Sequence, residues 1–309
     1  MEIALKMAYQ YWQLSPLKKD RQKIKFLTFK EAYHGDTIGS VSLGAIDLFH
    51  RIFKNLLFKT IQIEGFDLKK TETILKKSHQ QIAAIAIEPM IQGAAGMLLQ
   101  PKGFLKNLEK LAKKYNVLLI CDEVATGFGR TGKMFAIEHE KVQPDIMAVA
   151  KGITGGYLPL AATLTTQKIY NRFKGPYKDF KTFFHGHTYT GNPLAAAVAI
   201  ESINIFEKEH TIQKLQPKIK YLTDKLKEIS AYSKIKEVRQ LGFMVGIEIK
   251  GYSAEERIGH QVIMEARRHG VILRPLGSVV VLMPPLSITI SELKKLLDVT
   301  FQAIKTVTK

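Results

Sequence analysis

Charged side chains follow three apolar segments of the sequence at the point where each segment ends. Glu88 follows "QIAAIAI", Asp122 and Glu123 follow "VLLIC", and Lys151 follows "DIMAVA". Each segment predicts a buried strand, and an ion at the end of such a strand is costly unless it is paired or used. For any one of these residues a structural salt bridge is the simplest explanation. Because ligands of open α/β sheets bind at the carboxyl ends of the strands, Lys151 and Asp122 together indicate a site.

Lys151 and Asp122 have complementary chemistry. A lysine partly removed from water can lose its proton and act as an amine nucleophile toward a carbonyl group. An aspartate at a neighbouring strand end can hold a protonated ring nitrogen. Pyridoxal 5'-phosphate requires this division of labour, with a lysine Schiff base and an acidic partner for the pyridinium. We therefore predict a pyridoxal-phosphate site in which Lys151 and Asp122 are catalytic.

Two further residues could hold a flat ring from its two faces. Val124 lies two residues after Asp122 and so shares its side of the extended chain. Tyr33, in "AYHGDT", follows another predicted strand and can stack on the opposite face of the ring. An ordinary half-buried tyrosine is an equally good interpretation of Tyr33.

The segments "FFHGHTYTGNP" and "VILRPLG" offer groups that bind anions. His185 and His187 would need a third ligand to hold a metal ion, and none stands nearby, so we predict no metal site. A polar turn before a helix that opens at Pro193 is the simpler interpretation, and it can donate N–H groups and the Thr188 hydroxyl to a phosphate. Arg274, predicted at the end of a strand, is either a surface residue or a fork for a carboxylate.

The elements that would position these residues form an α/β layer. Helical spacing predicts helices over 1–12 and 103–116. Apolar runs predict strands within 24–29, 82–87, 117–122, 145–150 and 158–166. Such continuously apolar strands indicate a parallel or mixed sheet that is covered on both faces.

A second, smaller α+β region follows. Helix is predicted from Pro193 to Ser230 with a break near His210, and then two strands joined by a glycine turn over 235–250. The remaining elements are expected to be a helix over 254–270, short strands within 271–275 and 278–285, and a final helix after Thr289. We predict a large cofactor-binding domain over 1–205 and a small α+β domain over 206–309.

Composition limits the class of protein. The chain has 309 residues, 46% of them apolar, and a single cysteine, Cys121, which excludes a disulfide framework and favours a reducing compartment. The most apolar stretch, 82–99, is interrupted by Glu88, Pro89 and Gln92, so we do not expect a membrane span. We expect no signal peptide and a cytoplasmic location.

The net charge of +18 raises the question of nucleic-acid binding. Only nine of the 46 basic residues are arginine, the residue favoured for bidentate phosphate contacts. The lysines are scattered, as in "LKKTETILKKSHQ", which is typical of the solvated face of a helix. We expect neither a nucleic-acid partner nor a membrane partner.

Five segments carry a family resemblance: "IEPMIQGAAGM", "CDEVATGFGRTGKMFAIEHE", "PDIMAVAKGITGGYLPLAATLTT", "HGHTYTGNPLAAAVA" and "RPLGSVVVLMPP". Over essentially its whole length the chain resembles the adenosylmethionine–8-amino-7-oxononanoate aminotransferases of biotin biosynthesis, a branch of the class III pyridoxal-phosphate aminotransferases. The resemblance implies the fold-type I architecture. That fold has a mostly parallel sheet of the seven-stranded type, flanked by helices and here incomplete at the N-terminus, plus a smaller C-terminal α+β domain.

The resemblance also implies roles at the cofactor. Lys151 would form the internal aldimine and move the substrate proton, and Asp122 would bind the pyridinium nitrogen. Tyr33 would be a third catalytic residue and would line the cofactor and substrate site, and Val124 would pack on the ring.

Four further residues have implied roles at the substrate and the phosphate. Gly186 would lie at the substrate, and Arg274 would hold the carboxylate of the oxononanoate. His187 and Thr188 would contact the cofactor phosphate from the partner subunit of a homodimer, His187 mainly through its backbone.

In the family, the opening helix follows a Gly-Ser phosphate-binding turn and a region that supplies a tryptophan and a tyrosine to the substrate pocket. The sequence here starts inside that helix, so we expect those parts to be absent and the chain not to be fully active alone. Adenosylmethionine is the implied amino donor, although some relatives use lysine. Two alternatives stay open: another ω-aminotransferase for ornithine-like or diamine substrates, and an inactive fragment that keeps the fold.

Overall fold

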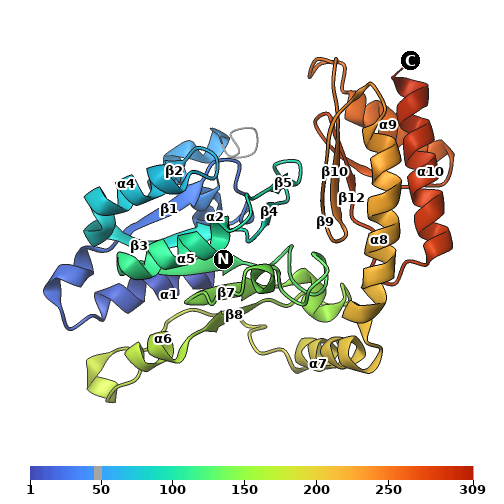
Figure 1. Ribbon diagram of the computed structural model, residues 1–309. Helices are drawn as coiled ribbons and strands as arrows, with labels where there is room; N and C mark the ends of the chain where they lie inside the picture. Colours follow the sequence, from blue (N-terminus) through green and yellow to red (C-terminus); the bar gives the residue numbers. More distant parts are fainter. Residues whose placement is uncertain (45–50, 309) are drawn as a thin grey trace. The chain divides into compact units, whose positions relative to one another are not determined.

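The computed structural model describes residues 1–44 and 51–308, and it consists of two compact units (Figure 1). The large unit comprises Met1–Met90, Gln100–Gly127 and Ala136–Asn204, and the small unit comprises Ile91–Leu99, Phe128–Phe135 and Ile205–Lys309. The junction at Ile205 lies within one residue of the boundary that the sequence predicts.

A six-stranded mixed sheet forms the centre of the large unit. Its strand order is β2-β1-β3-β6-β7-β8, one strand fewer among the described residues than the seven-stranded type. All pairings are parallel except that of β7 with the edge strand β8. The strands are β1 (Lys25–Phe29), β2 (Ile61–Ile63), β3 (Ile82–Ile87), β6 (Leu118–Asp122), β7 (Ile146–Val149) and β8 (Ala162–Thr165).

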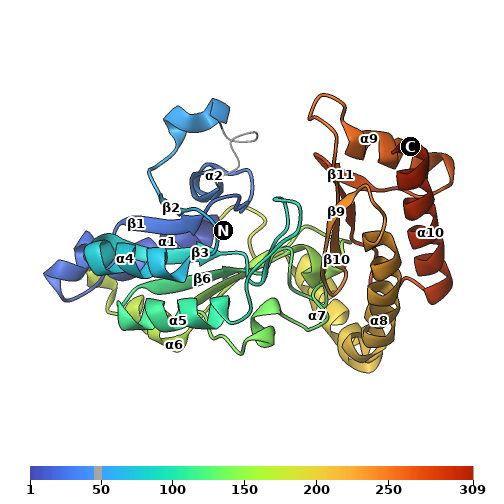
Figure 2. The ribbon, with the colours of Figure 1, turned by 45° about the horizontal axis from the view of Figure 1, so that its top comes forward.

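Helices cover both faces of this sheet, as the apolar strands predict (Figure 2). On one face α4 (Leu68–Ser78) and α5 (Phe104–Lys114) pack on alternate strand residues such as Leu27, Ile85 and Leu119. On the other face α1 (Glu2–Gln13), α2 (Ile38–Leu43) and α6 (Gln167–Arg172) pack on the intervening residues, among them Phe26 and Ile120. Because successive strand residues point to opposite faces, every position of β3 is buried.

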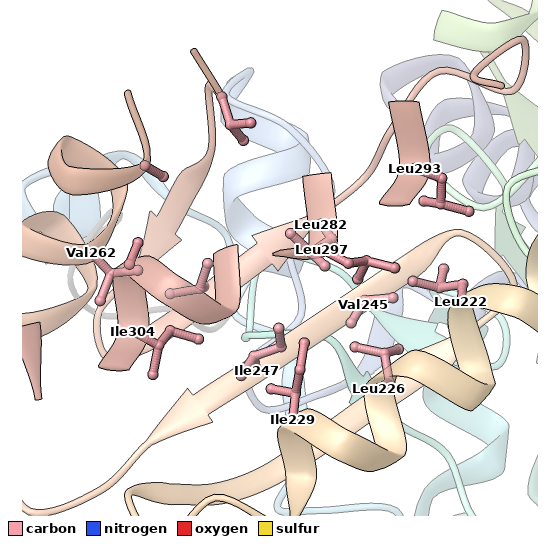
Figure 3. Close-up of a cluster of buried hydrophobic side chains, with 14 of the residues drawn as sticks. Leu222, Leu226, Ile229, Val245, Ile247, Val262, Leu282, Leu293, Leu297 and Ile304 are labelled. Atoms are coloured by element: carbon pink, nitrogen blue, oxygen red, sulfur yellow. The ribbon is translucent and has the colours of Figure 1, made fainter. Parts of the chain in front are cut away.

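The small unit is built on a four-stranded antiparallel sheet in the order β11-β12-β10-β9. The strands are β9 (Ile235–Leu241), β10 (Met244–Ile249), β11 (Arg274–Leu276) and β12 (Val279–Leu282). Three helices, α8 (Thr211–Ser230), α9 (Ile258–Arg268) and α10 (Ile290–Val307), bury their apolar sides on one face of the sheet. Figure 3 shows Leu226 and Ile229 of α8 beside Val245 and Ile247 of β10.

Two segments that the sequence places in the first domain belong to the small unit. The hairpin of β4 (Ile91–Gln92) and β5 (Leu98–Leu99) contributes Ile91 and Met97 to an apolar cluster with Met244 of β10 and neighbouring β12 residues. The buried Arg239 of β9 also donates from Nε to the carbonyl of Gly96, at 3.0 Å. The Arg239–Gly96 bond joins residues 143 positions apart, a contact that local sequence patterns do not reveal.

The remaining elements include α7 (Pro193–Lys208), which ends before the left-handed His210, where the sequence predicts a break. The short 3-10 helices are η1 (Lys18–Gln22), η2 (Arg51–Leu56), η3 (His79–Gln81), η4 (Ala136–His139), η5 (Lys151–Thr154) and η6 (Tyr177–Asp179). No helix of the described residues is both long enough and apolar enough to cross a bilayer.

Two predicted boundaries differ from those observed. α9 begins at Ile258 rather than near residue 254, because Ser253 N donates to Glu256 Oε2 and Arg257 has a left-handed backbone. Arg274 begins β11 instead of ending a strand, since the pairing of this segment with β12 starts at Arg274 and runs to Leu276. Val271, which the sequence places in that strand, donates its N–H to Ala266 O at the end of α9.

Candidate functional site

The parallel strands of the large unit end at one edge of the sheet, and four of the residues that the sequence singles out lie at these strand ends. Tyr33 follows β1, Glu88 follows β3, Asp122 ends β6, and Lys151 follows β7. In the sheet order these strands are consecutive, β1-β3-β6-β7. The edge therefore carries an aromatic ring, two carboxylates and an amine.

Asp122 is a buried carboxylate with two hydrogen-bond donors. Its side chain is 5% exposed. Oδ1 accepts the backbone N–H of Val124 at 3.1 Å, and Oδ2 lies 2.7 Å from Nδ1 of His34. Because an ionised carboxylate only accepts, the His34 ring donates from Nδ1 in this contact. Val124 itself is half-buried and lies in the turn after β6, beyond the end of the strand at Asp122, so the strand spacing used in the prediction does not apply to it.

His34 is a site residue that the sequence analysis missed. Its ring is fully buried, and Nε2 has no hydrogen-bond partner among the described residues. The only signal was its place in "AYHGDT", one residue after Tyr33 in a loop that follows a strand. No periodic pattern distinguishes such a histidine from an ordinary turn residue.

Glu88 and Asp36 fix the loop that carries Tyr33 and His34. Glu88 is 5% exposed, and its Oε1 accepts the backbone N–H of Tyr33 at 3.1 Å. The Tyr33 hydroxyl donates to Asp36 Oδ1 at 2.8 Å, and Tyr33 is half-buried. The aromatic ring is thus held at both its backbone and its hydroxyl end.

Lys151 differs from the sequence-based expectation in its surroundings. β7 ends at Val149, and Lys151 begins η5 with a left-handed backbone, φ +48°. The side chain is exposed in this chain rather than partly removed from water. A non-glycine residue in the left-handed region costs about 1–2 kcal/mol, and such outliers concentrate at functional sites. The register nevertheless pairs Asp122 with Ala148, three residues before Lys151.

Glu123, next to Asp122, is buried and is held by hydrogen bonds to other parts of the large unit. It is fully buried, and its oxygens accept from Thr126 Oγ1 at 2.5 Å and from Ile137 N at 2.9 Å. Burial raises the pKa of Glu123 to about 6, although these hydrogen bonds act in the opposite direction. Glu123 therefore joins the loop after β6 to η4. This is a structural role, one of the two kinds of role that the sequence leaves open for a charged residue at the end of a strand.

The remaining predicted residues lie elsewhere. Gly186, His187 and Thr188 are exposed in the segment before α7. His187 N already donates to Thr190 Oγ1 at 3.0 Å, and Tyr189 N donates to His187 Nδ1. Arg274 is exposed on β11, in the small unit.

The sequence model of the family Aminotransferase class-III matches residues 1–304. This chain belongs to the class III aminotransferases. The adenosylmethionine-8-amino-7-oxononanoate aminotransferase of Aquifex aeolicus is 50% identical to it, over 100% of this chain and 73% of the relative. The enzyme of the same name from Geobacter sulfurreducens is 46% identical, with the same coverage.

A solved structure of an aminotransferase with the same name also matches this chain. The crystal structure of adenosylmethionine-8-amino-7-oxononanoate aminotransferase from Methanocaldococcus jannaschii superimposes with a TM-score of 0.95 at 43% identity. The match covers 99% of this chain and 72% of that one. The predicted fold class and the predicted pyridoxal-phosphate dependence are thereby confirmed.

The residues of this class III aminotransferase fit the cofactor. A pyridinium nitrogen needs an acidic partner, and Asp122 is buried, oriented by two donors, and placed at the sheet edge where ligands bind. An amine follows the neighbouring strand at Lys151. In the turn that follows Lys151 in the chain, Gly155 and Gly156 have left-handed backbones. A Cβ placed on Gly156 would meet no atom within 4 Å. Open space at that turn allows close approach of a ligand to the backbone.

Replacing His34 with leucine in this aminotransferase should lower stability and weaken cofactor binding. The change removes a donor from a buried carboxylate, which costs about 1–3 kcal/mol. Urea unfolding and titration with pyridoxal phosphate measure the two effects. His260→Leu, at an exposed histidine of α9, is the matched control and should change neither. Unchanged stability and binding in His34→Leu would contradict the assignment.

Replacing Glu123 with glutamine should flatten the pH dependence of stability between about pH 4.5 and 6. The pKa of Glu123 is raised in the folded chain, so the folded state holds the proton more tightly than the unfolded state. Its contribution is therefore largest below pH 4.5 and is lost as the pH rises through 6, a change of up to about 2 kcal/mol. Unfolding free energies of both proteins across this range provide the test, and parallel curves would refute it.

Proposed function

We propose that this class III aminotransferase transfers an amino group to 8-amino-7-oxononanoate, giving 7,8-diaminononanoate for biotin biosynthesis, with adenosylmethionine as the amino donor. The observation that carries the proposal is the pair of Asp122 and Lys151 at the ends of the neighbouring strands β6 and β7. The names of relatives that are 46–50% identical supply the substrate.

Each residue of the pair has a separate task in this proposal. Bound pyridoxal phosphate supplies an electron sink for the carbon that loses its proton. Asp122 would keep the ring nitrogen protonated, and His34 and Val124 N would keep Asp122 oriented. Lys151 Nζ would hold the cofactor and carry the proton that moves between carbon atoms.

The substrate groups have candidate partners on this chain. We assign the substrate carboxylate to Arg274, whose guanidinium can form two parallel hydrogen bonds with it. Tyr33 and Gly186 are assigned to the wall of the substrate site, and Val124 to one face of the cofactor ring. A cytoplasmic location agrees with the single cysteine, Cys121, which is buried and free.

Lys151→Ala should abolish the visible absorbance band that pyridoxal phosphate develops on binding, because the variant has no amine at this position. Lys294→Ala is the control, because Lys294 is exposed on α10 of the small unit, and it should leave the band unchanged. A wild-type chain that forms no band would contradict the proposal at its first step.

The substrates are tested by comparing different amino acceptors and different amino donors in separate assays. Single-turnover assays with 8-amino-7-oxononanoate should show amino transfer, and ornithine and diamine substrates should not. Adenosylmethionine should load the enzyme with amino groups, and lysine should not. Activity confined to ornithine or diamines would favour the alternative ω-aminotransferase instead.

We also propose that the chain forms a homodimer through α7 and the segment before it. α7 is strongly apolar, yet only Ala195 and Ala199 are buried in it, whereas Leu194 is 70% and Ile200 61% exposed. Tyr189, just before the helix, is 76% exposed. Exposed large apolar side chains gathered on one segment in this way are typical of a protein interface. Thr188 and His187 would then reach the cofactor phosphate of the other copy.

Ile200→Asp should shift the chain from dimer to monomer, because a carboxylate would be buried in the interface. Ile290→Asp, which places the same charge on the exposed start of α10, is the matched control and should leave the dimer intact. Sedimentation velocity measures the outcome. A wild-type monomer, or a dimer that survives Ile200→Asp, would refute this interface.

A further inference from the structure

Glu2, in the first turn of α1, binds the start of α2. Its Oε1 accepts the backbone N–H of Gly39 at 2.6 Å and that of Ser40 at 3.1 Å. The two helices are far apart in sequence but are neighbours in the large unit. A carboxylate is favourable there, because the N–H groups in the first turn of a helix have no partner within the helix.

Gly39 leaves room for the carboxylate of Glu2. A Cβ placed on Gly39 would lie 2.3 Å from Glu2 Oε2 and 2.7 Å from Oε1, far inside van der Waals contact. The backbone of Gly39 is helical, so its conformation does not require glycine. Alanine would otherwise be favoured at this position by about 1 kcal/mol. The carboxylate of Glu2 therefore occupies the space that a side chain would take.

The loop that begins at Tyr33 ends at this contact. Its first residues are held by Glu88, which accepts from Tyr33 N, and by Asp122, which accepts from His34. Near its middle, a Cβ placed on Gly35 would lie 3.5 Å from Ser40 Cβ and Oγ, so the loop packs on α2 next to His34. The residue beside His34 therefore packs against the first turn of α2.

We propose that Glu2 is a positioning residue for the cofactor site. By fixing Gly39 and Ser40, it sets the loop that places the His34 ring on Asp122. The inference rests on the proposed function only in taking Asp122 as the partner of the cofactor ring. It assigns to a residue of α1 a part in aligning a group on β6.

A double-mutant cycle tests the contact in the chain without cofactor. Wild type, Glu2→Ala, Gly39→Ala and the double variant carry the same short N-terminal tag, so that residue 2 is not at a free terminus. Gly39→Ala should lower the urea midpoint when Glu2 is present and raise it, or leave it unchanged, when residue 2 is alanine. An equal loss in both backgrounds would show that Glu2 is not what excludes a side chain at position 39.

The positioning role is tested by the ring of His34. In protein with ¹⁵N-labelled histidine, the Nδ1–H signal that His34→Leu removes should shift or broaden in Glu2→Ala and be restored in Glu2→Gln, which keeps an acceptor. Asp67→Ala is the matched control, because Asp67 is also a carboxylate that caps a helix of the same unit, accepting from Lys70 N at 2.9 Å. An unchanged His34 signal in Glu2→Ala would reduce Glu2 to a helix cap.

Cofactor binding separates this inference from the proposed function. Glu2→Ala should raise the Kd of pyridoxal phosphate several-fold, and Asp67→Ala should not. A wild-type chain that binds no cofactor would refute the proposed function, yet the cycle and the His34 signal would still decide the role of Glu2. If Glu2→Ala had a normal Kd but a displaced His34 signal, the link between the position of the His34 ring and cofactor binding would be refuted.

Discussion

The buried carboxylate of Asp122 is the constraint on which the surrounding loops depend. An ion that is almost inaccessible to water needs hydrogen-bond donors, and one of those that it has comes from the loop after β1. In the sheet order, β3 lies between β1 and β6, so this loop must pass the end of β3 to reach Asp122. Glu88, at the end of β3, accepts from Tyr33 N on the way. One electrostatic requirement thus couples three consecutive strand ends.

The sequence predicts the part of this arrangement that local patterns encode. Continuous apolar strands next to charged residues single out Asp122 and Lys151. The cost of burying a charge applies to Asp122, whereas Lys151 is exposed. The two-sided covering of the sheet follows from the same apolar strands. The break at His210 and the helix after Thr289 were also predictable, and Thr289 and Glu292 form a capping box there.

The rest depends on contacts between residues distant in sequence. His34 meets Asp122 across 88 residues and Gly39 meets Glu2 across 37, and neither pair carries a periodic signal. The β4–β5 hairpin joins the small unit through packing that no neighbouring residue specifies. Lys151 is exposed although its strand is apolar, because the chain leaves the strand at Val149 and turns through a left-handed residue.

The left-handed backbone at Lys151 has a consequence for directed evolution. Glycine adopts that conformation without steric cost, and asparagine more readily than lysine does. Selection for heat resistance alone would therefore favour replacing the residue to which we assign the reactive amine. A library screened for folding and not for turnover should lose Lys151 early, so stability and activity must be selected together in this chain.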